Sequence, residues 1–73
     1  MNIISQTEIN GRGGTIQKTH VCHNGKHYVI SETPKETLIF PSDHKGKHDY
    51  FEVGSALHTS EAIMKIQNGQ IMS

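Results

Sequence analysis

The sequence predicts an α+β fold: a small antiparallel sheet of three to five strands, built from hairpins, with one short C-terminal helix packed on one face. Short stretches rich in β-branched and aromatic residues recur along most of the 73-residue chain, separated by turn-forming dipeptides. Near the end, Ala62, Ile63 and Ile66 follow helical spacing. No linker divides the chain, so we expect residues 1–73 to form a single small domain.

The first expected strand ends in a glycine-rich turn. Ile3, Ile4 and Ile9 belong to a short apolar-polar stretch, and residues 10–14 (NGRGG) follow it. Three glycines in four positions permit positive φ, which is typical of a turn or mobile loop. Backbone amides in such a turn can bind an anion with help from Arg12, but the lysine and hydroxyl of a P-loop are missing.

Residues 15–23 and 26–31 are predicted to form a hairpin around Asn24-Gly25, a dipeptide that tolerates the positive φ of a type I′ turn. The two-residue turn pairs His23 with Lys26. Alternation along both strands then places on one face His20, Cys22, His27 and Val29. The other face carries the larger apolar groups and is expected to meet the helix; it holds Val21, His23, Lys26, Tyr28 and Ile30.

The second half of the chain predicts two more strands and the helix. Residues 33–35 (TPK) break the chain, residues 37–40 form a strand, and Pro41 places its end at an edge or a bulge. Residues 42–49 are expected to be a polar loop and residues 50–53 the next strand. Gly54-Ser55 then leads to the helix.

The ends of the helix are predicted from capping residues. Thr59 or Ser60 can cap its first turn, and Glu61 suits the positive end of its dipole. Asn68-Gly69 supplies a stop signal. Ala62, Ile63 and Ile66 would form the buried stripe.

Composition limits the classes of function. Apolar residues make up 33% and aromatic residues 5% of the chain, so the core is thin, and we expect a homodimer, a higher oligomer or folding on a partner. Seven basic and seven acidic residues cancel, which argues against general nucleic-acid or membrane binding. Cys22 alone cannot form an intrachain disulfide. With no signal peptide and no apolar run of membrane-spanning length, the expected location is the cytoplasm.

The order of three motifs resembles a group of short bacteriophage proteins of uncharacterised function. Residues 28–31 (YVIS), 36–40 (ETLIF) and 50–53 (YFEV), followed by 59–62 (TSEA), match the order "V-S-T", "E-T-M-V-F", an aromatic-glutamate strand and "T-x-E-E-A" in that group. The resemblance covers roughly residues 27–66, and a brief connection at 32–35 replaces the group's glycine- and proline-rich insert. It implies a phage origin, hence the host bacterial cytoplasm, and brings no known activity.

The most distinctive motif is a doubled H-x-G-K-H, at residues 23–27 and 44–48. In the first copy, His20, Cys22 and His27 share a face and could bind zinc with a fourth ligand from His44, His48 or a partner chain. Structural zinc sites usually contain two cysteines, so a polar sheet face is the favoured interpretation. In the second copy, we expect a longer loop with Gly46 in the left-handed region and with lysines and histidines splayed outward.

These observations favour a small phage-type binding protein that acts on a host protein, as an inhibitor of a defence or gene-expression factor, rather than an enzyme. No cofactor is expected. The predicted contact residues are Arg12, His44, Lys45, Lys47, His48 and Tyr50. One alternative is a nucleotide- or nucleic-acid-binding module that uses the basic loop tips; another is a metal-stabilised structural protein.

Overall fold

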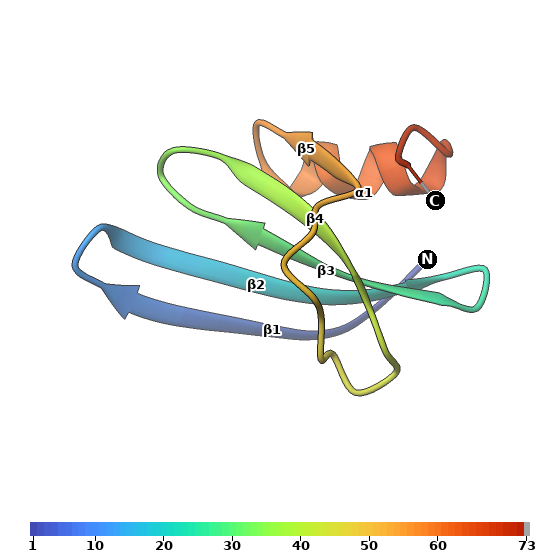
Figure 1. The fold of residues 1–73 in the computed structure, drawn as a ribbon, viewed down its shortest axis with the longest axis horizontal. Helices are drawn as coiled ribbons and strands as arrows, with labels where there is room; N and C mark the ends of the chain where they lie inside the picture. The colour runs from blue at the N-terminus through green and yellow to red at the C-terminus, as the bar shows by residue number, and fades with distance from the viewer. Residues whose placement is uncertain (73) are drawn as a thin grey trace.

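The computed structural model describes residues 1–72 as a five-stranded antiparallel sheet with one helix on one face (Figure 1). The strands follow chain order across the sheet, β1-β2-β3-β4-β5. Their bounds are β1 (Asn2–Gly11), β2 (Gly14–His23), β3 (Lys26–Glu32), β4 (Thr37–Ser42) and β5 (Gly54–Ala56), and helix α1 spans Thr59–Gln67. The predicted α+β architecture is therefore confirmed.

The β2–β3 hairpin has the predicted register. Asn24 and Gly25 adopt positive φ angles of 53° and 79°, and His23 pairs with Lys26 across the turn. Cys22 pairs with His27 in the same ladder. The alternation of side chains between the two faces therefore also follows the sequence prediction.

The hydrophobic core lies between the sheet and α1, on the face predicted to meet the helix. Its buried members come from β2, β3, β4, the segment before β5, and α1: Val21, Tyr28, Ile30, Ile39, Val53, Ala62 and Ile66. Ile63 is partly buried against this cluster, which confirms the predicted helical stripe, and Ile71 packs there from the C-terminal tail. Since α1 covers only part of the sheet, β1 contributes no buried residue.

The β1–β2 hairpin is longer than the short apolar-polar stretch predicted at the N-terminus. The predicted glycine turn is present: Gly11 pairs with Gly14, whose φ is 114°. The register shifts between Ile3 and Ser5, so one extra residue forms a β-bulge in β1. Pairing with β2 holds all ten residues of β1 extended although every one of them is exposed.

The predicted strand at residues 50–53 is wrong. Tyr50 and Phe51 are exposed, and the last strand is β5, which begins at Gly54, paired with Ile39. Residues 50–52 do not pair with β4, because this part of the chain leads from the basic loop to the edge of β4. Val53 reaches that edge, where its N–H donates to the Ile39 carbonyl at 2.8 Å.

Helix α1 begins at Thr59, but the predicted cap by the Thr59 or Ser60 side chain is wrong. The N-cap residue is His58, which forms no side-chain cap. Glu32 of β3 takes this role, because its Oε1 accepts hydrogen bonds from the Thr59 N–H (2.8 Å) and hydroxyl (2.6 Å). The helix ends at Asn68-Gly69 as predicted, with Gly69 at φ 68°.

Two further features concern the surface of the fold. Pro41 lies at the edge of β4, as predicted, between the last residue that pairs with β5 and the isolated bridge of Ser42 with His48. Within residues 1–72, no helix is long and apolar enough to cross a membrane.

Candidate functional site

The segment from Asp43 to His48, which we call the basic loop, is a compact turn held by one carboxylate. Oδ1 of Asp43 accepts hydrogen bonds from the backbone N–H groups of Lys45 and Lys47, both at 2.9 Å. These bonds, above all the one from Lys47, hold the pKa of Asp43 below its usual range. Gly46 has a φ of +85°, which confirms the predicted left-handed glycine in a loop longer than two residues.

The basic loop folds back over the face of the sheet opposite α1, so the expectation that all its basic side chains splay outward is wrong. The His48 ring stacks on Phe40 with a centroid distance of 4.9 Å and an interplanar angle of 22°. Tyr50 meets both rings edge-on. Phe40 faces away from the helix and offers an apolar surface that the loop covers. His44, Lys45 and Lys47 are exposed as expected.

Beneath the loop, two histidines on neighbouring strands form a direct pair. Nε2 of His20 lies 2.9 Å from Nδ1 of His27, a hydrogen bond in which one ring donates and the other accepts. His20 is only 6% exposed. Burial, followed by the charge of His27, lowers the pKa of His20. Neutral His20 is therefore the favoured form in the folded protein.

The zinc candidates are only partly brought together. Cys22 lies opposite His27 in the ladder and is a half-buried free thiol. His20 and His27 direct ring nitrogens at each other. Across residues 1–72, no three His, Cys, Asp or Glu side chains are grouped so that they could hold a metal ion.

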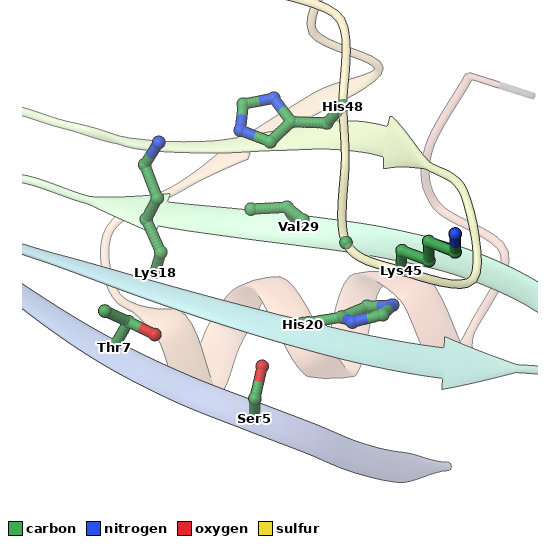
Figure 2. Close-up of a pocket in the computed structure, with 8 residues that line it drawn as sticks. Ser5, Thr7, Lys18, His20, Val29, Lys45 and His48 are labelled. Carbon is green, nitrogen blue, oxygen red and sulfur yellow. The ribbon is translucent and has the colours of Figure 1, made fainter.

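The loop and the sheet enclose a hollow of about 250 Å³ (Figure 2). Val29 forms part of its floor and Gly46 part of its wall. Its polar lining combines hydroxyl, ammonium and imidazole groups from β1, β2 and the loop: Ser5, Thr7, Lys18, His20, Lys45 and His48. No carboxylate lines it, so the hollow offers mainly hydrogen-bond donors and positive charge.

The β-bulge in β1 places the two hydroxyls in this hollow. Before the bulge, Ile3 pairs with Val21; after it, Ser5 pairs with His20 and Thr7 with Lys18. Without the extra residue, Ser5 and Thr7 would fall on the helix-facing side of the sheet, because a one-residue shift exchanges the faces. The bulge thus selects which side chains of β1 reach the hollow.

The predicted contact residues fall into two separate places. The basic loop and the segment after it carry His44, Lys45, Lys47, His48 and Tyr50. Arg12 instead lies at the β1–β2 turn, beside a groove of about 340 Å³ that Pro34 also lines. The prediction missed Ser5 and Thr7, because the β1 register contains a bulge that no local motif signals. It also missed Lys18, although alternation along β2 places Lys18 on the same face as His20.

Comparison of the chain with protein-family models, curated proteins and solved structures gives no match. The resemblance of residues 27–66 to short phage proteins therefore stays a prediction.

Proposed function

We propose that the chain is a small phage-encoded binding protein, working in the host cytoplasm, that blocks a host defence or gene-expression protein by docking along the free edge of β1. One observation carries the proposal: all ten residues of this edge strand are exposed. Ile3, Ile4 and Ile9 remain 54%, 48% and 45% exposed. A binding role of this kind requires a complementary surface and no catalytic group.

The edge of β1 has one of the usual protections of an exposed strand, the β-bulge between Ile3 and Ser5, and lacks the others. Edge strands present unpaired N–H and C=O groups, and proteins commonly guard them with lysine, proline, a β-bulge or short length. β1 has ten residues, no lysine, no proline and a single charged residue, Glu8. Such an edge is suited to accept a strand of another protein, which would add main-chain hydrogen bonds and cover the isoleucines.

The basic loop supports a partner with acidic groups beside its docking strand. Lys45 of the loop and Ser5 and Thr7 of β1 line the same hollow, so the loop borders the β1 strand. His44 and Lys47 are exposed on the same loop. Charge complementarity at the rim of an interface sets orientation and association rate. We therefore expect a host protein whose docking strand is flanked by aspartate or glutamate.

The test compares two matched substitutions in tagged protein incubated with bacterial lysate. Ile9→Lys adds a charge at the proposed edge, whereas Met64→Lys makes a similar change on α1, where Met64 is 59% exposed. We expect one host protein, identified by mass spectrometry, to bind the wild type and Met64→Lys but not Ile9→Lys. The purified partner should then lose activity when the wild type or Met64→Lys is added, and keep its activity when Ile9→Lys is added.

Three outcomes would overturn the proposal. The first is the absence of a retained host protein while the bait stays folded. The second is a retained protein that binds Ile9→Lys as well as the wild type. The third is a dimer of the purified chain, detected by light scattering, that Ile9→Lys dissociates; a second copy would then be the occupant of the β1 edge.

A further inference from the structure

We propose that the basic loop is an acid-released cover: when His20 and His27 are both protonated, the tip of the loop, residues 43–47, lifts off the sheet face opposite α1 while the sheet and the helix stay folded. At neutral pH the tip is closed over this face. The switch belongs to the free chain, so it does not depend on a partner at the β1 edge.

The contact between the two histidines is compatible with closure only while at least one ring is neutral. Nε2 of His20 and Nδ1 of His27 lie 2.9 Å apart, so one nitrogen must donate and the other accept. The two ring centroids are 5.0 Å apart. When both rings are protonated, both facing nitrogens carry hydrogen and both rings are positive, so the hydrogen bond becomes a repulsive contact.

Gly46 connects this contact to the loop. A Cβ atom at Gly46 would lie 3.1 Å from Nδ1 of His20, so the backbone of the tip lies directly against the ring. His20 lies on β2 beneath the segment that leads to His48 (Figure 2). Because the tip covers the ring, a movement of His20 toward water displaces the tip.

A movement of His27 alone would not remove the strain on the closed form. His27 is half-buried, so its ring could turn away from His20. That movement would end the contact between the rings, but a charged His20, only 6% exposed, would stay beneath the tip and out of water. Opening of the tip gives the charged ring both water and distance from His27.

The groups around the histidine pair give its charged form little support. Those on this face and in the loop are Lys18 and Cys22 of β2 and Asp43, His44, Lys45 and His48 of the loop, while β1 contributes the uncharged Ser5 and Thr7 and β4 pairs Ser42 with His27. Among residues 1–72, Asp43 is the one carboxylate whose charge acts on His20. A second positive charge on the pair therefore has only Asp43 to compensate it.

The direction of the pH effect follows from the burial of His20. Burial, and then the charge of His27, lower the pKa of His20 in the closed form. With the tip open, the ring returns to water and to its ordinary pKa of 6.5. The open form therefore binds more protons, and a fall in pH below that value favours opening.

The tip can move as a unit because its hydrogen bonds are internal. Oδ1 of Asp43 accepts the N–H groups of Lys45 and Lys47, and the Asp43 carbonyl accepts the Gly46 N–H at 3.1 Å. The Asp43 N–H donates to the Lys47 carbonyl at 3.0 Å. None of these bonds has to break when the tip leaves His20.

The base of the loop stays attached to the sheet. His48 forms a β-bridge with Ser42, and its ring stacks on Phe40. Protonation of His48 does not oppose this stack, because a cation is attracted to the face of an aromatic ring. Acid therefore acts on the contact at Gly46 and leaves the base of the loop in place.

The experiment measures the exposure of methyl groups on the two faces of β3 by NMR, with a soluble paramagnetic gadolinium chelate as the probe. Val29 lies in the hollow beside Gly46 and is 3% exposed, whereas Ile30 is fully buried in the core on the helix side. Opening of the tip should expose Val29 to the probe and leave Ile30 protected.

The ratio of open to closed tip should rise about tenfold between pH ~7.5 and ~5.5, because a free imidazole with a pKa near 6.5 is about ten times more often charged than neutral at the lower pH. The probe should then relax the Val29 methyl signals faster at the lower pH. The Ile30 methyl signals should not change.

Two histidine variants separate the buried pair from the general charge of the loop. In His20→Gln the ratio should change by less than about twofold, because glutamine takes up no proton in this range. His44→Gln removes an exposed histidine of the same loop and should keep most of the rise. His27→Gln should give a smaller rise than the wild type, because His20 is still buried but has lost its charged neighbour. Melting temperatures at neutral pH verify that each variant is folded, and His27→Gln serves as the test if His20→Gln does not fold.

The proposal is overturned if acid does not increase the effect of the probe on Val29 in the wild type. An equal increase at Ile30 would also overturn it, because the whole chain would then be unfolding. A rise that persists in His20→Gln, or that is lost as completely in His44→Gln, would mean that the contact between His20 and His27 does not control the tip.

Discussion

Gly46 allows the basic loop to lie directly against His20, because glycine has no side chain. A Cβ atom at this position would lie 3.1 Å from Nδ1 of His20, closer than ordinary van der Waals contact. Gly25, in the turn between β2 and β3, has a similar φ of +79° but no atom within 4 Å of such a Cβ. Both glycines therefore adopt a positive φ, but only Gly46 has neighbouring atoms that an added Cβ would contact.

This difference predicts unequal costs for two alanine substitutions. Gly25→Ala should lower the free energy of unfolding by about 1 kcal/mol, the cost of a left-handed conformation with a Cβ. Gly46→Ala should cost about 2 kcal/mol, because the His20 ring or the loop must also move. Urea unfolding measures both values. Equal costs would mean that the loop does not rest on His20.

Because the pKa of His20 is lowered in the folded protein, we expect the protein to lose stability on mild acidification. This pKa is lowered first by burial and then by the charge of His27, while Asp43 opposes the shift and His44 adds to it. Lys18 and Lys45, which line the same hollow, are further positive groups near it. Because the unfolded chain keeps the higher pKa, it binds more protons as the pH falls below 6.5, and folding stability falls with it.

The measurement is urea unfolding of the wild type and of His20→Gln at several pH values from about 7.5 down to about 5.5, a window around the ordinary histidine pKa. Glutamine keeps a hydrogen-bonding group near His27 but cannot be protonated in this range. We expect the wild type to lose more stability than the variant over this window. Parallel curves for the two proteins would show that His20 is not responsible.

At the scale of elements, the contact between β3 and the start of α1 predicts a stability effect. Glu32 accepts both hydrogen bonds of Thr59, and the bond from the hydroxyl is the main reason that the pKa of Glu32 is lowered. Its contribution is present above the ordinary value of 4.5 and is lost as the pH falls through the lower folded pKa. Glu32→Ala should cost about 1 kcal/mol at neutral pH, as for the loss of a helix cap.

Glu36→Ala is the matched control for this prediction, because Glu36 is an exposed glutamate in the neighbouring β3–β4 connection. It should change the free energy of unfolding by less than about 0.5 kcal/mol, as surface substitutions usually do. Glu32→Gln should lie between the two alanine variants, since its amide oxygen still accepts hydrogen bonds but has no charge to interact with the helix dipole. A cost of Glu32→Ala no larger than that of Glu36→Ala would contradict the proposed cap.

The elements also show which parts of the fold local sequence could predict. Asn24-Gly25 specifies its turn through two residues that tolerate positive φ, so the β2–β3 register and its two faces followed directly. Residues 50–53 have strand composition, but their structure depends on where the preceding loop leaves the chain. The cap from Glu32 joins residues 27 positions apart, a contact that no local motif contains.

The candidate site also has parts that the local sequence could predict and parts that it could not. The sequence drew attention to the basic loop and to His20, but it placed them together only in the zinc-site alternative, with His44 or His48 as a fourth ligand. Their contact in the structure depends on Phe40, which stacks with His48 and holds the loop over the sheet. Ser5 and Thr7 were missed because a β-bulge, which decides their face, leaves no signature in the surrounding residues.

At the scale of the whole molecule, helix α1 covers only part of the sheet. The helix and the core lie over β3, β4 and the C-terminal half of β2, whereas β1 forms the opposite edge of the sheet (Figure 1). An isolated two-stranded hairpin is at most marginally stable in water, so β1 depends on its pairing with β2. We expect the opening of β1 to require less free energy than unfolding of the core.

Amide hydrogen exchange of the free protein measures this difference residue by residue. In a dilute sample, amides of Ile30 and Ile39, whose side chains are fully buried, should exchange the slowest, at rates set by global unfolding. Those of β1 should exchange faster by an order of magnitude or more, since about 1.4 kcal/mol less for opening already gives a factor of ten. Protection of β1 equal to that of β3 would show that β1 is part of the cooperative core. Protection that rises with protein concentration, and only in β1, would show that a second copy pairs with this edge. Fast exchange that slows only when the host protein is added is the result expected if β1 is kept open for that partner.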